Sequence, residues 1–179
     1  KNVLPAMLNA GEKMYSYRFE GYWKDVGTIS SLWEANMDLL GAVPKFDLRD
    51  TERVIHSRSP LAPPAYVQGD VINSMIANGC DVEGTVINSV IGTNCVIEKG
   101  AEVKDSVLMG NTIVKAGAKV NYSIIDEDVT VGKKAKVGDV IEKASKIEGK
   151  TNGITVLGRG LTVSDGKAVP AGEIIDKNV

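Results

Sequence analysis

The stretch Phe19–Thr28 holds the side chains with the clearest capacity for chemistry. It reads Phe-Glu-Gly-Tyr-Trp-Lys-Asp-Val-Gly-Thr, and Asp25 falls at the expected end of a strand, just before Gly27 and the start of a helix. A carboxylate placed there can reach a metal ion in a cleft, and Mg²⁺ usually takes one or two protein carboxylates together with phosphate oxygens. The alternative role of Asp25 is a turn or helix-capping carboxylate.

The residues around this aspartate are weaker candidates. Trp23 is a candidate contact for a sugar and Lys24 for a phosphate, so both are candidate substrate-binding residues. Ordinary roles compete with these, because Tyr22 and Trp23 are typical of aromatic residues that pack on a sheet, and a lysine in a strand is commonly exposed. Glu34 and Asp38 lie one helical turn apart, and we expect them to be surface acids.

The histidine and the two cysteines of the chain are weak candidates for a functional site. His56 is the one histidine of the chain and lies between Arg53 and Arg58, which makes it a candidate pH or effector sensor or, more simply, a polar linker residue. Cys80 and Cys95 are expected to be buried, unreactive thiols on neighbouring turns of a repeat, since no histidine stands near them to complete a metal site. Two cysteines cannot build a disulfide framework, which favours a reducing cytoplasm.

Short elements are predicted on both sides of the aspartate. Residues 3–8 favour a helix that stops at Gly11, and residues 14–19 and 21–26 favour two strands. Thr28 can cap a following helix that ends at Gly41 and carries one apolar stripe interrupted by an asparagine. The stripe consists of Ile29, Leu32, Trp33, Asn36, Met37 and Leu40.

An internal repeat dominates the second half of the chain. Four segments share the pattern Val-x-x-Ser followed by two aliphatic residues, with the serines 15, 17 and 17 residues apart. The segments begin at Val71, Val86, Val103 and Val120, and their serines are Ser74, Ser89, Ser106 and Ser123. Val137 continues the step, with Val140 expected in the serine position. After a break at residues 142–152, a six-residue period resumes at Leu157, Val163, Val169 and Ile175.

This spacing predicts a left-handed parallel β-helix of the hexapeptide-repeat type, preceded by a small α/β remnant. Three short strands form a triangular coil of about 18 residues, and each coil stacks on the one before. Val86, Val103, Val120 and Val137 should form one inward ladder, with Lys104 and Asn121 pointing outward. Glycine and asparagine should occupy the corners, where a positive φ is favoured. An open antiparallel sheet is the alternative, but it needs a hairpin turn every 8–12 residues or so.

Composition and prolines divide the chain and exclude some partners. The sequence has 179 residues, of which 43% are hydrophobic but only 5% aromatic, as a core of small aliphatic side chains requires. We place the α/β remnant at residues 1–42, a proline-rich linker at 43–64 and the β-helix at 65–179.

A net charge of −2 without a basic run argues against nucleic acid as a partner, and no apolar run is long enough to cross a membrane. The first residue is not methionine, so we expect the chain to be a fragment.

The motif Tyr-Trp-Lys-Asp-Val-Gly-Thr at residues 22–28, followed by residues 33–40, resembles the segment that closes the catalytic domain of bacterial ADP-glucose pyrophosphorylases (glucose-1-phosphate adenylyltransferases). The resemblance is nearly unbroken over residues 3–40 and looser through the repeats. It implies an enzyme that makes ADP-glucose and pyrophosphate from ATP and glucose 1-phosphate for glycogen synthesis, with Mg²⁺ as cofactor. It also implies that Asp25 is one of two metal-binding aspartates. The β-helix would carry allosteric regulation and the contacts of a homotetramer, or of a heterotetramer with a regulatory subunit.

The resemblance leaves alternatives open. The glycine-rich nucleotide loop and the sugar-phosphate lysine of that family are not found in these residues, so we expect the chain alone to be inactive. A catalytically silent regulatory subunit and a purely structural oligomerisation module are two further hypotheses. A hexapeptide acyltransferase is a third, although such enzymes generally use a histidine on a coil, and His56 precedes the coils.

Overall fold

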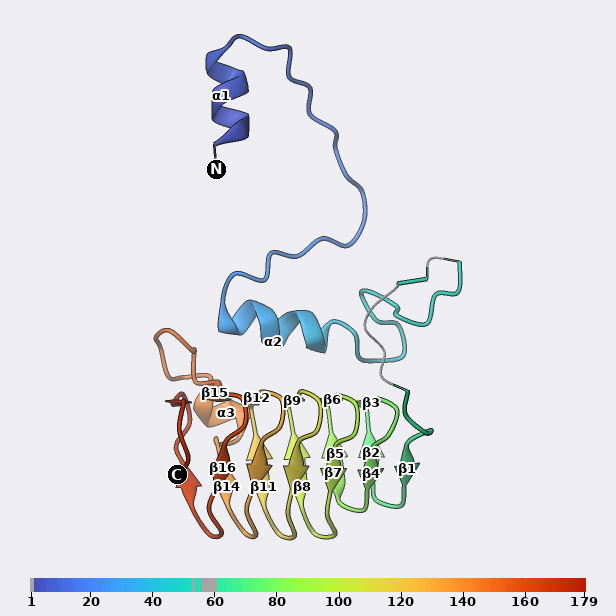
Figure 1. Ribbon diagram of the computed structural model, residues 1–179, viewed down its shortest axis with the longest axis vertical. Helices are drawn as coiled ribbons and strands as arrows, with labels where there is room; N and C mark the ends of the chain where they lie inside the picture. The colour runs from blue at the N-terminus through green and yellow to red at the C-terminus, as the bar shows by residue number, and fades with distance from the viewer. Residues whose placement is uncertain (1, 53, 56–60) are drawn as a thin grey trace.

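The computed structural model describes residues 2–52, 54–55 and 61–179, and its strands stack into a three-sided solenoid (Figure 1). Each side of the solenoid is a parallel sheet of six short strands, and successive strands in a sheet come from successive coils. Because all pairs are parallel, the antiparallel alternative is excluded and the predicted β-helix is confirmed.

The strands are two or three residues long. The first sheet contains β1 (Tyr66–Val67), β4 (Asp81–Val82), β7 (Val96–Ile97), β10 (Ile113–Val114), β13 (Thr130–Val131) and β16 (Thr162–Val163). The second contains β2 (Val71–Ile72), β5 (Thr85–Ile87), β8 (Glu102–Lys104), β11 (Lys119–Asn121), β14 (Lys136–Val137) and β17 (Ala168–Val169). The third contains β3 (Met75–Ile76), β6 (Val90–Ile91), β9 (Val107–Leu108), β12 (Ser123–Ile125), β15 (Thr155–Leu157) and β18 (Ile174–Ile175).

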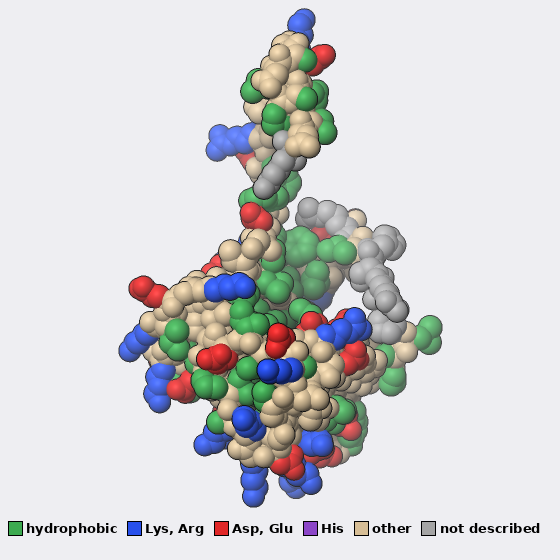
Figure 2. Space-filling model, turned by 60° about the vertical axis from the view of Figure 1, so that its left-hand side comes forward, with side chains coloured by type: hydrophobic (Ala, Val, Ile, Leu, Met, Phe, Trp, Pro, Cys, Tyr) green, Lys and Arg blue, Asp and Glu red, His purple; other side chains and the backbone are tan. Residues whose placement is uncertain are grey.

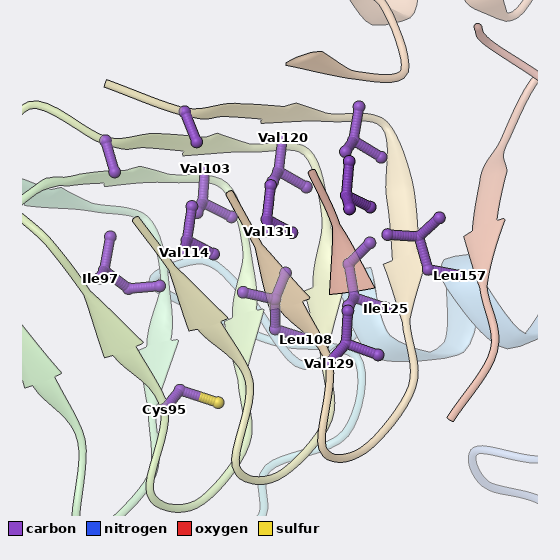
Figure 3. Packing of buried hydrophobic residues seen from close by; sticks show 14 of the residues in the cluster. Cys95, Ile97, Val103, Leu108, Val114, Val120, Ile125, Val129, Val131 and Leu157 are labelled. Atoms are coloured by element: carbon purple, nitrogen blue, oxygen red, sulfur yellow. The ribbon is translucent and has the colours of Figure 1, made fainter. Parts of the chain in front are cut away.

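The predicted valine ladder lines the interior. Val86 pairs with Val103, Val103 with Val120, and Val120 with Val137, and none of the four is accessible to solvent. Figure 3 shows Val103 and Val120 pointing into the same interior as residues from the other two sheets. Since one inward side chain per strand must fill a narrow triangle, Val, Ile and Leu suit the core and large aromatic residues do not.

The repeat serines form a second ladder of hydrogen bonds. Each hydroxyl donates to the carbonyl oxygen two residues earlier, at 2.8 Å for Ser89 and 2.7 Å for Ser106. Each hydroxyl oxygen also accepts the amide N–H of the next serine, at 3.0 Å from Ser106 to Ser89 and 3.1 Å from Ser123 to Ser106. A hydroxyl that both donates and accepts satisfies two buried backbone groups at each corner, which is why serine recurs there.

The prediction for Val140 is wrong. Thr155, not Val140, is the register partner of Ser123, because the chain leaves the coil after β14 and returns at β15. Val140 instead precedes the short helix α3 (Ile141–Ala144), and a valine has no hydroxyl with which to extend the serine ladder. Gly138 lies where the chain leaves the coil. Its φ is +73°, and an added Cβ would lie 2.0 Å from the Asn121 carbonyl oxygen, so glycine is required there.

The corner prediction is confirmed. Asn73, Asn88 and Asp105 all have φ between 44° and 50°, and equivalent corners on another edge carry further asparagines. The Asn73 amide donates to Asn88 at 2.8 Å, and the Asn88 amide donates to Asp105 at 2.7 Å. Side chains of one corner therefore stack as a polar ladder along the outside of the solenoid.

The N-terminal region differs from its prediction. Helices α1 (Val3–Asn9) and α2 (Ile29–Met37) form where expected, but residues 12–28 form no strand. A strand needs a partner for its backbone groups, and no strand of the described residues lies alongside this segment. The segment runs extended, away from the solenoid, and Figure 2 shows hydrophobic side chains exposed on the projecting part. Tyr15 and Tyr17 of this segment are both strongly exposed.

Candidate functional site

The segment that contains Asp25 has two different sides. Tyr22 and Lys24 are partly buried, whereas Trp23 and Asp25 are exposed, so burial alternates along the extended backbone. Trp23 presents 76% of its surface to solvent. The side chains of Tyr22 and Lys24 contact the C-terminal end of α2 and the residue after it, and those of Trp23 and Asp25 are open to solvent.

The contacts of Tyr22 and Lys24 converge on Asp38, the residue after α2. Asp38 Oδ2 accepts hydrogen bonds from the Tyr22 hydroxyl at 3.1 Å and from Lys24 Nζ at 3.3 Å. Asp38 Oδ1 accepts one from Lys45 Nζ at 2.7 Å. Lys24 Nζ also lies 2.9 Å from Glu34 Oε2 on the same helix. The carboxylate of Asp38 thus joins three segments of the chain.

Asp38 is not the surface acid that its sequence position suggested. Its side chain is only 10% exposed, whereas that of Glu34 is 54% exposed and agrees with the prediction. The relevant signal was the two-residue spacing of Tyr22 and Lys24, which places a hydroxyl and an ammonium on one side of an extended segment. The sequence alone did not show that this side faces the end of α2.

Electrostatics at this cluster follow from its hydrogen bonds. The hydrogen bond from the Lys45 ammonium lowers the pKa of Asp38, bonds from Lys24 and Tyr22 act in the same direction, and burial opposes them. The hydrogen bond to Glu34 raises the pKa of Lys24. Burial, followed by the hydrogen bond to Asp38, raises the pKa of Tyr22. At neutral pH these shifts keep Asp38 ionised and leave Lys24 and the Tyr22 phenol protonated.

Asp25 lies immediately before a capped helix start, as the motif predicted. The Thr28 hydroxyl accepts the Ser31 amide N–H at 3.1 Å, and the Ser31 hydroxyl accepts the Thr28 N–H at 2.9 Å. This reciprocal pair fixes the chain direction at the N-terminus of α2. Asp25 itself makes no hydrogen bond or ion pair within the described part of the chain, so its carboxylate oxygens are available to a ligand.

A carboxylate of this kind fits Mg²⁺, which prefers hard oxygen donors. Among the described residues there is no group of three or more acidic, histidine or cysteine side chains that could hold a metal ion. Asp25 can therefore supply one ligand, and the other protein ligands of such a site would come from elsewhere.

Helix α2 links this motif to the solenoid. Trp33 Nε1 donates to the Asp105 carbonyl oxygen at 2.8 Å, and the Trp33 ring meets Tyr122 edge-on with centroids 5.0 Å apart. Leu32 and Met37 pack against the same apolar cluster on the outside of the third sheet. The predicted stripe of this helix is thus the face that docks on the β-helix (Figure 1).

The insertion between β14 and β15 also contacts the start of α2, next to the motif at residues 22–28. Asn152 Nδ2 donates to the Ser30 hydroxyl at 3.2 Å, across 122 residues. Lys150 and residues 26–28 line part of a cavity of about 370 Å³. The segment next to Asp25 is therefore in contact with the insertion that interrupts the repeat.

The remaining candidates take no part in this cluster. Cys80 and Cys95 are buried and unpaired by disulfide, as expected, and their thiols lie 3.0 Å and 3.2 Å from the carbonyl oxygens of Gly92 and Met109. The neighbouring Cys80 thiol and burial raise the pKa of Cys95, which makes it a poor nucleophile. The sensor candidate His56 and its neighbours Arg53 and Arg58 lie outside the described residues.

No helix in the described part of the chain is long and apolar enough to cross a membrane.

Comparison with known proteins divides the chain as its structure does. Residues 1–41 match the nucleotidyl transferase family model, and residues 63–157 match the model of the GlmU-like C-terminal hexapeptide. A glucose-1-phosphate adenylyltransferase of Acetivibrio thermocellus is 38% identical over 98% of this chain and 42% of its own length. The enzyme of the same name from Clostridium acetobutylicum is 51% identical over 45% of this chain and 22% of its own length.

The chain spans less than half the length of these curated relatives. The resemblance read from the motif at residues 22–28 is confirmed, because the similarity to glucose-1-phosphate adenylyltransferases covers nearly the whole chain. With more than half of its residues matched by one family model, this chain belongs to the GlmU-like C-terminal hexapeptide family and is similar throughout to glucose-1-phosphate adenylyltransferases.

Proposed function

We propose that this chain is part of a glucose-1-phosphate adenylyltransferase that makes ADP-glucose and pyrophosphate from ATP and glucose 1-phosphate for glycogen synthesis in the cytoplasm. The observation that supports this most is the similarity to one such relative over 98% of the chain, with a nucleotidyl transferase match followed by a hexapeptide match. The exposed Asp25 in the motif at residues 22–28 supports the catalytic rather than the regulatory type of subunit.

In this proposal Asp25 contributes one carboxylate to a bound Mg²⁺. Nucleotidyl transfer places negative charge on phosphate oxygens and on departing pyrophosphate, and the metal ion offsets that charge when it is bound. Asp25 suits the role because its carboxylate is exposed and has no competing cation among the described residues. Trp23, exposed on the same side, is the candidate sugar contact.

Lys24 is a different case. We keep it as a candidate phosphate contact, but its ammonium lies 2.9 Å from Glu34 and 3.3 Å from Asp38. To bind a phosphate, Lys24 would have to exchange one or both carboxylates for the ligand. Its present contacts favour a role in holding the motif against α2.

The β-helix, in this proposal, serves oligomerisation and allosteric regulation, as a homotetramer or as a heterotetramer with a regulatory subunit. Strands β1, β2 and β3 each have a partner on one side only within the described residues. Such an open edge can be covered by another copy or another segment. The docked helix α2 connects this scaffold to the motif that carries Asp25.

A chimera tests the proposal, with this chain replacing the aligned region of the Acetivibrio thermocellus relative. The chimera should form ADP-glucose from ATP, glucose 1-phosphate and Mg²⁺, and the 179-residue chain alone should not. Asp25→Asn should reduce the rate at least about 100-fold, because it removes roughly 3 kcal/mol or more of transition-state stabilisation. Glu12→Gln, an exposed acid of the same region, is the matched control and should stay within about twofold. A folded chimera that is inactive, or one indifferent to Asp25→Asn, contradicts the proposal.

A further inference from the structure

We infer that Asp38 is a positioning residue that fixes the direction of the Asp25 carboxylate by holding Tyr22 and Lys24 against α2. This inference rests on the proposed role of Asp25 as a metal ligand. Asp38 itself is shielded by its partners and does not share the exposed side of the segment, so it would act through the motif rather than on a substrate.

The contacts of Asp38 come from both sides of α2 in sequence. Tyr22 and Lys24 precede the helix, and Lys45 follows it. Lys45 donates two hydrogen bonds to Asp38: its ammonium donates to the carboxylate at 2.7 Å, and its backbone amide donates to the main-chain carbonyl at 3.0 Å. Phe46 stacks on the Tyr22 ring at 5.4 Å between centroids. The carboxylate therefore closes a small cluster in which the motif, the helix end and the following loop hold one another.

Burial and the number of its partners distinguish Asp38 from Glu34, which lies nearer to Lys24, at 2.9 Å against 3.3 Å. Glu34 is 54% exposed, and ion pairs at such positions contribute little because water screens them. Asp38 is 10% exposed and accepts three side-chain hydrogen bonds, so removing its charge leaves Lys24, which is 22% exposed, with one carboxylate instead of two. Loss of Asp38 should release the segment, whereas loss of Glu34 should not.

Asp25 lies between two anchored residues, Lys24 and Thr28, which is why the Asp38 contact bears on its direction. The ten steps from Thr28 to Asp38 along α2 cover about 15 Å at 1.5 Å per residue. The four steps from Lys24 back to Thr28 cover at most about 14 Å when extended. The Lys24 side chain adds further reach, so the segment spans to Asp38 without being stretched, and it is held at one end by the helix cap and at the other by the Lys24 contact with Asp38. Asp25 lies between these two anchored points and directly follows Lys24, so the Asp38 contact restricts its backbone on the N-terminal side.

The first test needs only the 179-residue chain. Fluorine NMR of fluorotryptophan-labelled protein reports on the two tryptophans separately: Trp23 is next to Lys24, and Trp33 is the internal control in the α2 interface. Asp38→Asn should shift and sharpen the Trp23 resonance and leave that of Trp33 in place. Glu34→Gln, which removes an equal charge from the same helix and the same lysine, should leave both resonances unchanged. Identical spectra for the two variants overturn the inference.

The second test uses the chimera and its dependence on Mg²⁺. Asp38→Asn should raise the Mg²⁺ concentration for half-maximal activity about tenfold, Glu34→Gln should change it less than about twofold, and Asp38→Glu should restore much of the loss. If Asp38 acts through Asp25, then Asp38→Asn added to Asp25→Asn should cause no further loss, because coupled residues are not additive. Additive losses, or an unchanged Mg²⁺ requirement, overturn the inference.

The two proposals fail in distinguishable ways. If the parent chimera is inactive, or if Asp25→Asn has no effect, the proposed function is refuted. The Trp23 resonance still tests whether Asp38 holds the segment. A strong effect of Asp25→Asn together with a wild-type response of Asp38→Asn removes only the positioning role. If Asp38→Asn displaces the Trp33 resonance too, the change is a general structural one, and the positioning role is rejected unless Asp38→Glu restores both the resonances and the Mg²⁺ dependence.

Discussion

Trp33 Nε1 donates a 2.8 Å hydrogen bond to the main-chain oxygen of Asp105, and this bond joins residues that are 72 positions apart in the chain. It connects the helix after the Asp25 motif to a corner of the β-helix. The edge-on contact of the same indole with Tyr122 adds an aromatic interaction at the same place. A helix that begins in the nucleotidyl transferase match is thus part of the surface of the hexapeptide solenoid.

Trp33→Phe tests this connection. The variant keeps an aromatic ring but leaves the Asp105 carbonyl without its donor, which should cost about 1–2 kcal/mol in the free energy of unfolding. Trp23→Phe is the matched control, because Trp23 is 76% exposed and should change stability by less than about 0.5 kcal/mol. Urea unfolding followed by circular dichroism measures both. Equal losses would mean that the Trp33 hydrogen bond does not stabilise the docked helix.

The serine ladder gives a second prediction. Ser106 is inaccessible to solvent, accepts the Ser123 amide and donates to the Lys104 carbonyl, so Ser106→Ala leaves the Ser123 amide unpaired and the Lys104 carbonyl with the Tyr122 amide as its remaining donor. The expected loss is about 1–3 kcal/mol of unfolding free energy. The control Ser164→Ala changes an exposed serine and should be nearly neutral. Ser106→Ala with wild-type stability would show that the ladder is not needed to satisfy the corner.

Protonation of Asp38 gives a third prediction, with a defined direction. Its folded pKa is lowered by Lys45, Lys24 and Tyr22, so the contact is fully present above the ordinary aspartate pKa and is lost as pH falls through the lower folded value. In an acid titration of the labelled chain, the Trp23 resonance should move toward its position in Asp38→Asn, with a midpoint below about 3.9. Asp38→Asn should lack this transition. A midpoint above that value would contradict the ion-pair geometry.

The sequence predicted the solenoid well because its signal is local and repeated. In each coil a valine indicates an inward position, and a serine, asparagine or glycine indicates a corner. The register of Val86, Val103 and Val120 could therefore be predicted from the spacing of these residues. Val140 was misplaced because a spacing of 17 residues continued by chance into the insertion. The true partner of Ser123 is Thr155, whose side chain also carries a hydroxyl.

The site was harder to predict because its contacts are not periodic. The motif showed Asp25 and the cap at Thr28, but the role of Asp38 depends on where an extended segment crosses a helix. The strands expected at residues 14–19 and 21–26 depend on partners that are not among the described residues, and alternation of side chains cannot supply those partners. Side-chain pattern therefore predicted the faces of this segment better than its secondary structure.

The last prediction concerns the interior of the solenoid. Val103 is inaccessible to solvent and lies between Val86 and Val120 in register, whereas its neighbour Lys104 is partly exposed. Val103→Asp places an unpaired charge in a narrow apolar interior, so the residue must take up a proton or the coil must open. The cost should be several kcal/mol against a total stability of about 5–15 kcal/mol. Lys104→Asp should cost less than about 0.5 kcal/mol, as changes at partly exposed positions usually do. Thermal melts of the two variants compare these positions directly, and equal tolerance would mean that the side chains of β8 do not alternate between core and solvent.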